Sequence, residues 1–343
     1  MHKLTIFIPT YNRELKVIKT LEALVNQIKD DVLIIVLDNY SDIEIEKYCI
    51  NKSIDIEKMT NQGKIIFSRN KYNIGMSANF MRAFELCNSE WMWLISDDDD
   101  ISSSAIAEIL KTIDFLKNNK QVSFVKFSSS SCKNSEMDEY ITDIESFINI
   151  LAISKDWFNS FIFLTNGLYK VEQFKQEIQI GYQNLHTYVP HFIMLLNCIY
   201  KNKHSIYMSN VQVANYVPPE VGYSYGLVAG LGVGAFKNFT FNLKKESYLK
   251  LESIFAAHND FKVTVDIFYQ AKYNTNLFVA KRLIDNYYDL IKNSRGLTYR
   301  SLYRLFNMLV NFPNFFEFFI GLLAKLNPSI NKHVKEIIIR YKN

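Results

Sequence analysis

Short apolar runs alternate with longer segments of helical periodicity over the first 130 residues. The apolar runs predict five strands, at Leu4–Ile8, Val32–Leu37, Ile65–Phe67, Trp91–Ile95 and Val122–Phe127. Apolar residues at helical spacing predict helices at Glu14–Ile28, Gly75–Leu86 and Ile101–Leu116. Strands that are apolar throughout are typical of a parallel sheet covered on both faces. We therefore expect an α/β fold with a mostly parallel sheet and helices on both faces.

Polar clusters follow four of these strands, at Thr10–Arg13, Asp38–Asp42, Arg69–Asn73 and Asp97–Asp100. Ligands bind outside the carboxyl ends of the strands in such sheets. The last cluster is a run of four consecutive carboxylates. Such a run can be a solvated turn that caps the next helix, or it can hold a divalent cation through its oxygens. The convergence of four polar clusters at one edge favours the cation.

The pattern changes after residue 128. Residues 147–163 read as mixed helix and strand, Tyr188–Tyr200 as a helix and Ser205–Tyr216 as one or two strands. Gly222–Gly234 contains five of the 11 glycines and predicts a flexible crossover between domains. Helical periodicity dominates from Phe236 on. We expect one domain over 1–220, with halves 1–128 and 129–220, and a helical subdomain over 236–343.

Composition narrows the class of protein. Of 343 residues, 48% are hydrophobic and 22% are charged, as in ordinary globular proteins. The net charge of +4 is too small to indicate a nucleic-acid partner. The four cysteines lie far apart without a CxxC pair, which suits reduced thiols. No signal peptide and no apolar run of ~18 residues is present, so we expect a cytoplasmic protein.

Four motifs occur in order along the first 100 residues. They are IPTYNR (Ile8–Arg13), LDNYSD (Leu37–Asp42), NIGMSAN (Asn73–Asn79) and WLISDDDD (Trp93–Asp100). Together they resemble the N-terminal half of inverting family 2 glycosyltransferases, which have the Rossmann-like GT-A fold. The pattern is similar to bacterial transferases of lipopolysaccharide O-antigen and capsule biosynthesis, including abequosyltransferase-like members. The resemblance implies transfer of a sugar from a nucleotide-sugar donor, most often UDP-linked, to a saccharide or lipid-linked saccharide.

The resemblance also implies roles for individual residues. It gives residues 1–128 the nucleotide sugar and 129–220 the acceptor side. Nucleotide-sugar binding falls to Pro9, Thr10, Tyr11, Arg13, Asp38, Asn39, Ser41, Asn73, Gly75, Asn79, Asp97 and Asp98. In the DxD element, Asp97 would face ribose or sugar and Asp99 would bind Mn²⁺ or Mg²⁺, with Asp97 as the second metal residue. Asp98 and Asp100 are the alternative pair. The metal would stabilise the charge of the leaving diphosphate.

The sequence departs from the family at the general base. Most members carry an acidic pair, often Glu-Asp, at the start of a helix past the sheet, whereas residues 181–191 contain no acid. His191 and His186 are candidates, because a neutral imidazole is a competent base near neutral pH. Asp156 is an acidic alternative, and each of the three can instead be structural. The missing pair leaves a non-catalytic nucleotide-sugar or glycan-binding protein as the alternative function.

Two aromatic segments each allow two interpretations. Trp157, Phe158 and Phe161 can present a platform to an acceptor sugar or belong to the core. Leu302–Tyr341 interleaves phenylalanines with arginine and lysine. This segment can form a basic amphipathic surface on the cytoplasmic face of the inner membrane, or it can pack within the protein or form a homo-oligomer. We expect packing or oligomerisation for most of these phenylalanines.

Overall fold

The computed structural model describes residues 2–129, 139–153, 155–215, 242–255 and 311–326, with single positions between 265 and 338. The chain forms two compact units, the first of Met1–Leu185 and Val189–Pro219, the second of His186–Tyr188 and Glu220–Asn343. Each unit is considered by itself. The glycine-rich segment 222–234 and Cys132 lie outside the described residues.

The first unit is built on an eight-stranded sheet in the described part of the chain, with strand order β3-β2-β1-β4-β8-β6-β9-β7. The strands are β1 (Leu4–Thr10), β2 (Val32–Asp38), β3 (Ile65–Arg69), β4 (Trp91–Leu94), β6 (Val122–Ser128), β7 (Glu139–Ile141), β8 (Gly167–Lys170) and β9 (Ser205–Gln212). β1 pairs in parallel with β2 and β4, and β2 with β3. β8 runs antiparallel between β4 and β6, and β7 runs antiparallel to β9. A separate two-stranded ribbon joins β5 (Asp100–Ile101) to β10 (Ala214–Asn215).

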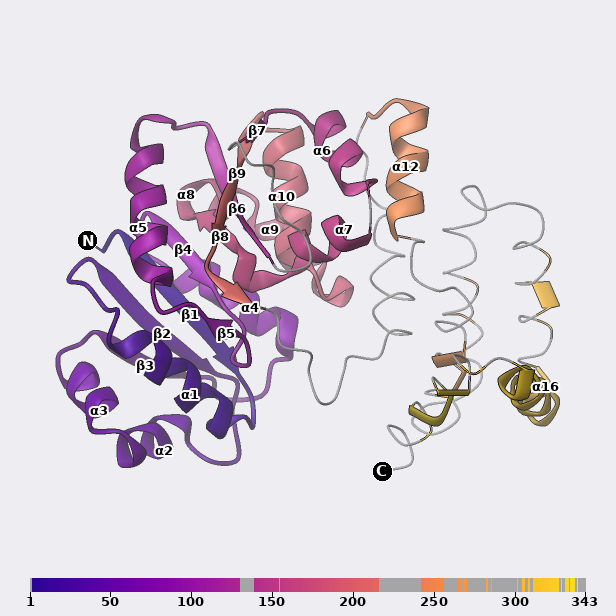
Figure 1. Ribbon diagram of the computed structural model, residues 1–343, viewed down its shortest axis with the longest axis horizontal. Helices are drawn as coiled ribbons and strands as arrows, with labels where there is room; N and C mark the ends of the chain where they lie inside the picture. Colours follow the sequence, from indigo (N-terminus) through magenta and orange to yellow (C-terminus); the bar gives the residue numbers. More distant parts are fainter. Residues whose placement is uncertain are drawn as a thin grey trace. The chain divides into compact units, whose positions relative to one another are not determined.

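Helices cover both faces of this sheet (Figure 1). In the first unit they are α1 (Glu14–Val25), α2 (Ile45–Lys52), α3 (Ile54–Asn61), α4 (Met76–Leu86), α5 (Ala105–Phe115), α6 (Ile144–Leu151), α7 (Lys155–Ile162), α8 (Val171–Gln176), α9 (Ile178–Gln183) and α10 (Pro190–Tyr200). Short 3₁₀ turns are η1 (Leu116–Asn118), η2 (Leu164–Asn166) and η3 (Leu185–Thr187). In the second unit, the described helices include α12 (Lys245–Phe255) and α16 (Pro313–Leu326).

The side chains of β1 alternate between the two faces of the sheet, so this strand packs against the helices on both faces. Leu4, Ile6 and Ile8 join one fully buried cluster with residues of α1, α2, α3 and α5. Successive side chains of a strand point to opposite faces, so Phe7 points to the other face of the sheet, and it is also fully buried. β1 is thereby fixed at the centre of the sheet, where strand order reverses between β2 and β4. In α/β sheets this is the usual position of a ligand site.

The expected fold is confirmed, with several local differences, of which two concern the helices. Residues 43–62, for which the pattern predicts no element, form α2 and α3. The described residues of the range 147–163 lie in α6, in α7 and in the short turns after each helix, and none of them belongs to a strand. Both regions contain helices of eight residues, too short to repeat a helical apolar pattern clearly. Phe158 and Phe161 are core residues of α7, and Trp157 packs against the Phe161 ring.

Cys49, Cys87 and Cys198 are free thiols buried in the first unit. Across the described ranges, no helix has both the length and the apolar character needed to cross a bilayer.

Candidate active site

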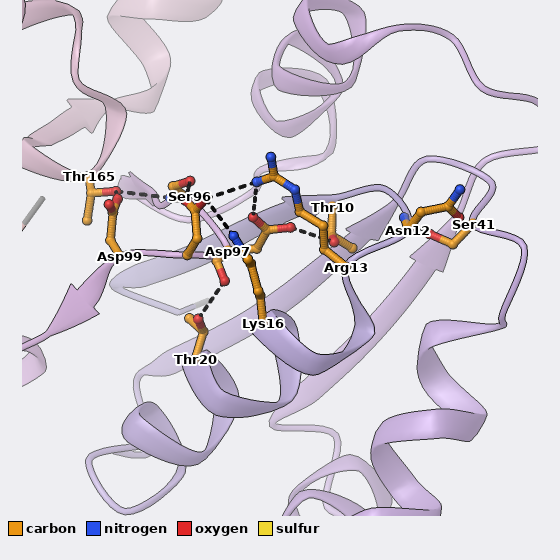
Figure 2. A network of polar contacts seen from close by, with 11 residues as sticks. Thr10, Asn12, Arg13, Lys16, Thr20, Ser41, Ser96, Asp97, Asp99 and Thr165 are labelled. Atoms are coloured by element: carbon orange, nitrogen blue, oxygen red, sulfur yellow. Dashed lines mark hydrogen bonds and ion pairs between the residues drawn. The ribbon is translucent and has the colours of Figure 1, made fainter. Parts of the chain in front are cut away.

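The acidic run lies at the carboxyl end of β4, next to the loop that follows β1. Asp97 is only 3% exposed. Its carboxylate accepts a hydrogen bond from the Thr10 hydroxyl at 2.7 Å and from Arg13 Nη1 at 2.9 Å. Its backbone carbonyl accepts from the Thr20 hydroxyl of α1 at 3.0 Å. Figure 2 shows these residues converging from the β1–α1 loop, α1 and the end of β4.

Opposing effects act on the Asp97 carboxyl. Burial raises its pKa above the ordinary value, while the Arg13 guanidinium and the Thr10 hydroxyl act to lower the pKa. Burial is the largest of these effects, so the net pKa is raised. A fold keeps such a costly group where its charge has a use, and perturbed carboxyls cluster at functional sites.

Asp98 connects the acidic run to two cations. Its Oδ2 lies 3.1 Å from Arg13 Nη1 and 3.5 Å from Lys16 Nζ. Its Oδ1 accepts a hydrogen bond from the Ser96 hydroxyl. Arg13 therefore bridges Asp97 and Asp98, and Lys16 adds a second positive charge from the first turn of α1. The sequence motifs did not indicate Lys16, because the motif ends at Arg13.

Asp99 faces the other side of the run and meets η2. Its carboxylate accepts a hydrogen bond from the Thr165 hydroxyl, and the same hydroxyl oxygen accepts from the Ser96 backbone N–H at 3.0 Å. Trp93 Nε1 donates to the Thr165 carbonyl at 2.8 Å. Thr165 is thus fixed against β4 and holds Asp99. Asp100, by contrast, is exposed and pairs with Asn215 through the β5–β10 ribbon.

The loop after β2 forms the neighbouring part of the edge. Asp38 is buried, and its carboxylate accepts from Arg69 Nη1 at 2.7 Å and from the Ser41 backbone N–H at 2.8 Å. The Ser41 hydroxyl accepts from the Asn12 backbone N–H at 2.9 Å. Asn12 also exchanges two hydrogen bonds with Asp42. The β1 and β2 loops are therefore joined, although both Asn12 and Tyr40 adopt positive φ.

A network of side-chain amides joins these loops to the start of α4. Asn39 donates to Asn73 Oδ1 at 2.8 Å, and Asn70 donates to both Asn39 and Asn79. Asn79 donates to the Leu37 carbonyl at 3.0 Å. Asn39, Asn70 and Asn79 are buried, so the network fixes the backbone. Gly75 at the start of α4 has a φ of 84° and a ψ of 157°, a conformation that glycine alone adopts readily.

Exposed aromatic side chains lie at the same edge. Tyr40 and Tyr72 have ring centroids 6.3 Å apart, and Tyr72 is 74% exposed. The Arg69 guanidinium lies 5.0 Å from the centroid of the Tyr40 ring. Tyr11, predicted as a nucleotide residue, is also exposed, while Pro9 lies buried within β1. The motifs did not single out Tyr40 or Tyr72, since an isolated tyrosine in a loop carries no pattern.

The three candidate bases lie in different settings. His191 is 2% exposed near the start of α10, with Nε2 3.1 Å from the Ile162 carbonyl and a buried Nδ1 that has no hydrogen-bond partner. Burial lowers its pKa to about 4. His186 is exposed in η3. Asp156 belongs to α7, but its side chain lies outside the described residues. Among the described residues, the ring of His191 lies next to the Ile162 carbonyl and the Tyr169 ring, and neither belongs to the acidic run.

The carboxylates of the acidic run suit a metal ion only if the substrate also supplies ligands to that ion. In the described part of the chain, no group of three or more histidine, cysteine or acidic side chains could hold an ion. Asp97 and Asp98 are both paired with Arg13. Asp99 offers a hard carboxylate ligand of the type Mn²⁺ and Mg²⁺ accept, and Mg²⁺ sites commonly use one or two carboxylates with substrate phosphates. The residues fit an ion bound jointly with a diphosphate.

Comparison with known proteins decides the family. The model of "Glycosyl transferase family 2" matches residues 5–200, which include the whole of this edge. This chain belongs to glycosyl transferase family 2. Abequosyltransferase RfbV of Salmonella typhimurium is 33% identical over 107 residues, covering 31% of this chain and 30% of that protein. A GalNAc(5)-diNAcBac-PP-undecaprenol beta-1,3-glucosyltransferase of Campylobacter jejuni is 25% identical over 111 residues, covering 32% and 34%. These matches span about a third of each relative.

Solved structures share the fold of this family 2 member. TarS 1-349 of S. aureus in complex with UDP has a TM-score of 0.56 at 16% identity, covering 92% of this chain and 90% of that one. The mannosyltransferase PcManGT of Pyrobaculum calidifontis, in complex with GDP-Man and Mn²⁺, has a TM-score of 0.50 at 12% identity, covering 99% and 86%. The GT-A architecture and the family expected from the motifs are both confirmed.

Proposed function

We propose that this protein is a metal-dependent inverting glycosyltransferase. It would move a sugar from a nucleotide-sugar donor, UDP-linked, to a saccharide or lipid-linked saccharide during assembly of a bacterial surface polysaccharide such as O-antigen or capsule. The observation that carries the proposal is the junction of Thr10 and Arg13 with the buried Asp97 in a family 2 chain. The UDP in the TarS structure and the names of the two relatives support the donor and the acceptor.

The nucleoside would occupy the edge formed by the β2 and β3 loops. Tyr40 and Tyr72 offer exposed aromatic faces for stacking a planar base. Asp38 and Asn39, as hydrogen-bonding groups fixed by Arg69 and Asn73, would read its polar edge. Rigid polar groups favour binding because little conformational freedom is lost when the ligand arrives.

The diphosphate would then lie toward the acidic run, since the β1 loop connects the two regions. Asp99 would hold Mn²⁺ or Mg²⁺ together with phosphate oxygens, and the ion would stabilise charge on the leaving diphosphate. Arg13 and Lys16 are placed to attract the same charge. Thr10 and Arg13 hold the Asp97 carboxyl group, which would face the ribose or sugar.

The general base must take the proton of the acceptor hydroxyl on the face opposite the leaving group. Two observations argue against His191 in this role: its ring is 2% exposed, and its Nε2 already lies 3.1 Å from the Ile162 carbonyl. We keep His186 and Asp156 as the candidates. A binding protein without a base is the alternative function, and it is favoured specifically by the absence of acid from residues 181–191.

A donor panel tests the proposal. UDP-, CDP-, GDP- and dTDP-sugars are incubated with the protein and Mn²⁺, and release of nucleoside diphosphate is measured with and without a lipid-linked saccharide. The transferase releases nucleoside diphosphate from one donor class, and His186→Ala or Asp156→Asn lowers the rate by ~10²–10⁴ if that residue is the base. Donor binding without release from any donor class would favour the binding protein.

Since the acceptor would be lipid-linked, we also propose that the protein works at the cytoplasmic face of the inner membrane.

A further inference from the structure

The helix α16 of the second unit, labelled in Figure 1, carries apolar residues on two faces, and only one of these faces is buried. Phe316, Ile320 and Ala324 recur at a spacing of four residues and are buried. The Phe316 ring lies 4.1 Å, between centroids, from that of Phe268 in the same unit. This face therefore anchors the helix within its own unit.

The other apolar face is open to solvent. Its members lie three or four residues apart and so form one stripe; they are Phe315 (57% exposed), Phe318 (68%), Leu322 (47%) and Leu326 (75%), and Phe312 (61%) lies just before the helix. The rings of Phe315 and Phe318 are neighbours, with centroids 6.4 Å apart. A contiguous row of exposed large apolar side chains marks an interaction surface, whereas scattered single ones do not.

The charge of the segment that contains this stripe favours one kind of partner. Residues 301–343 contain six lysines and arginines against two glutamates, an excess equal to the +4 of the whole chain. Lys325 is exposed within α16 itself, and Arg304, Lys332 and Lys335 are exposed elsewhere in the segment. An apolar row rich in phenylalanine with basic residues is the pattern of helices that lie in an anionic membrane interface.

Two other arrangements fit less well. A second copy of the chain would bring two positively charged segments together, and like charges repel. A membrane-spanning role fails on length, because the 14 residues of α16 extend only about 21 Å at 1.5 Å per residue, against ~30 Å of hydrocarbon. A helix lying flat on an anionic bilayer satisfies both the apolar row and the cations.

We propose that the exposed face of α16 binds the surface of a lipid bilayer that contains anionic phospholipids. Phe315, Phe318 and Leu322 insert between the headgroups, and Lys325 and the neighbouring cations pair with lipid phosphates. This surface goes beyond the sugar transfer proposed above and requires no catalysis. Vesicle binding and nucleoside diphosphate release are therefore separate measurements, and either can fail alone.

Vesicle co-sedimentation of the full chain tests the proposal. Vesicles of phosphatidylcholine alone are compared with vesicles containing phosphatidylglycerol. The unmodified protein is expected to bind the anionic vesicles. The double variant Phe315→Ser/Phe318→Ser is expected to bind them at least ~10-fold more weakly, because it lacks two phenyl groups that would otherwise move from water into the bilayer. Phe115→Ser is the matched control, since Phe115 is a similarly exposed phenylalanine on α5 of the first unit; it leaves binding unchanged.

Charge reversal provides a second, independent variant. Lys325→Glu/Lys332→Glu weakens binding to anionic vesicles and leaves the thermal midpoint unchanged, because both side chains are exposed. Absence of binding by the unmodified protein, or equal binding by the serine variant, overturns the proposal. A dimer in lipid-free solution that the serine variant converts to a monomer overturns it in favour of self-association.

Discussion

At the scale of one residue, the buried Asp97 carboxyl makes the stability of the fold depend on pH. Its pKa is raised because burial outweighs the Arg13 guanidinium and the Thr10 hydroxyl. The folded state therefore binds this proton more tightly than the unfolded state does. The Asp97 carboxyl therefore stabilises the fold at low pH, and its contribution falls as pH rises from the ordinary pKa of 3.8 through the raised pKa.

Asp97→Asn replaces the buried charge with a neutral group of similar shape. We expect a thermal midpoint at pH 7 that is equal to or above that of the unmodified protein, because a costly ionised group is gone. Sugar transfer is expected to fall by ~10²–10³, the usual loss when one electrostatic group of an active site is removed. Calorimetry and the donor assay check both statements, and a normal transfer rate would remove Asp97 from the site.

His191 gives the opposite pH dependence. Burial lowers its pKa to about 4, against 6.5 when unperturbed. The unfolded chain then binds the proton more readily, so the stability supplied by the neutral ring is lost as pH falls from about 6.5 toward 4, by about 3 kcal/mol in all. His191→Gln, which can keep a donor toward the Ile162 carbonyl, should flatten this part of the profile. Urea unfolding at pH 7.0, 5.5 and 4.5 measures it; parallel profiles for both proteins would contradict the assignment.

Among the elements, the start of α4 depends most on one backbone conformation. Gly75 has a φ of 84° and a ψ of 157°, and no atom lies within 4 Å of the Cβ that a side chain would add. The cost of Gly75→Ala is therefore strain rather than collision, about 1–3 kcal/mol of unfolding free energy. The amide network of Asn73 and Asn39 adjoins this residue, so nucleotide binding should weaken as well.

Gly63→Ala is the matched control for this variant. Gly63 also has a positive φ, 70°, and no atom lies within 4 Å of the Cβ that a side chain would add. It precedes β3, whereas Gly75 follows that strand. It should lose comparable stability and keep its affinity for nucleotide. Urea unfolding together with nucleotide titration separates the two glycines. Equal affinities for both variants would show that the α4 start has no part in the binding edge.

For the whole molecule, the sequence predicts the elements that follow from repeating apolar patterns. It misses contacts between residues that lie far apart along the chain. The parallel strands follow from continuous apolar runs, and the polar clusters follow from their ends. Thr165 lies 66 residues from Asp99, and it reaches the acidic run because η2 leads into β8, which inserts antiparallel between β4 and β6. Four residues, GLYK, are too few to show strand periodicity. Lys16 was missed because the helical pattern of α1 predicts only that this position is exposed. The pattern says nothing of the Asp98 carboxylate that Lys16 contacts.

The proposed metal requirement would be a property of the protein together with its donor. The contacts described at the acidic run set three carboxylates, Asp97, Asp98 and Asp99, against the two cations Arg13 and Lys16. Adding a diphosphate increases the negative charge, so a divalent cation should bind cooperatively with it. We expect the nucleoside diphosphate preferred in the donor panel to bind at least ~10-fold more tightly with Mn²⁺ than in a chelator, a coupling of about 1.4 kcal/mol.

Two alanine variants locate the carboxylate that shares this ion. Asp99→Ala should abolish the Mn²⁺ gain and leave affinity in the chelator unchanged, because Asp99 would meet the nucleotide only through the metal. Asp100→Ala is the control, since that side chain is exposed on the β5–β10 ribbon one residue further on. Calorimetric titration of all three proteins, each with and without Mn²⁺, gives the comparison. If Asp100→Ala loses the gain and Asp99→Ala keeps it, the metal pair is Asp98 and Asp100, shifted by one residue along the run.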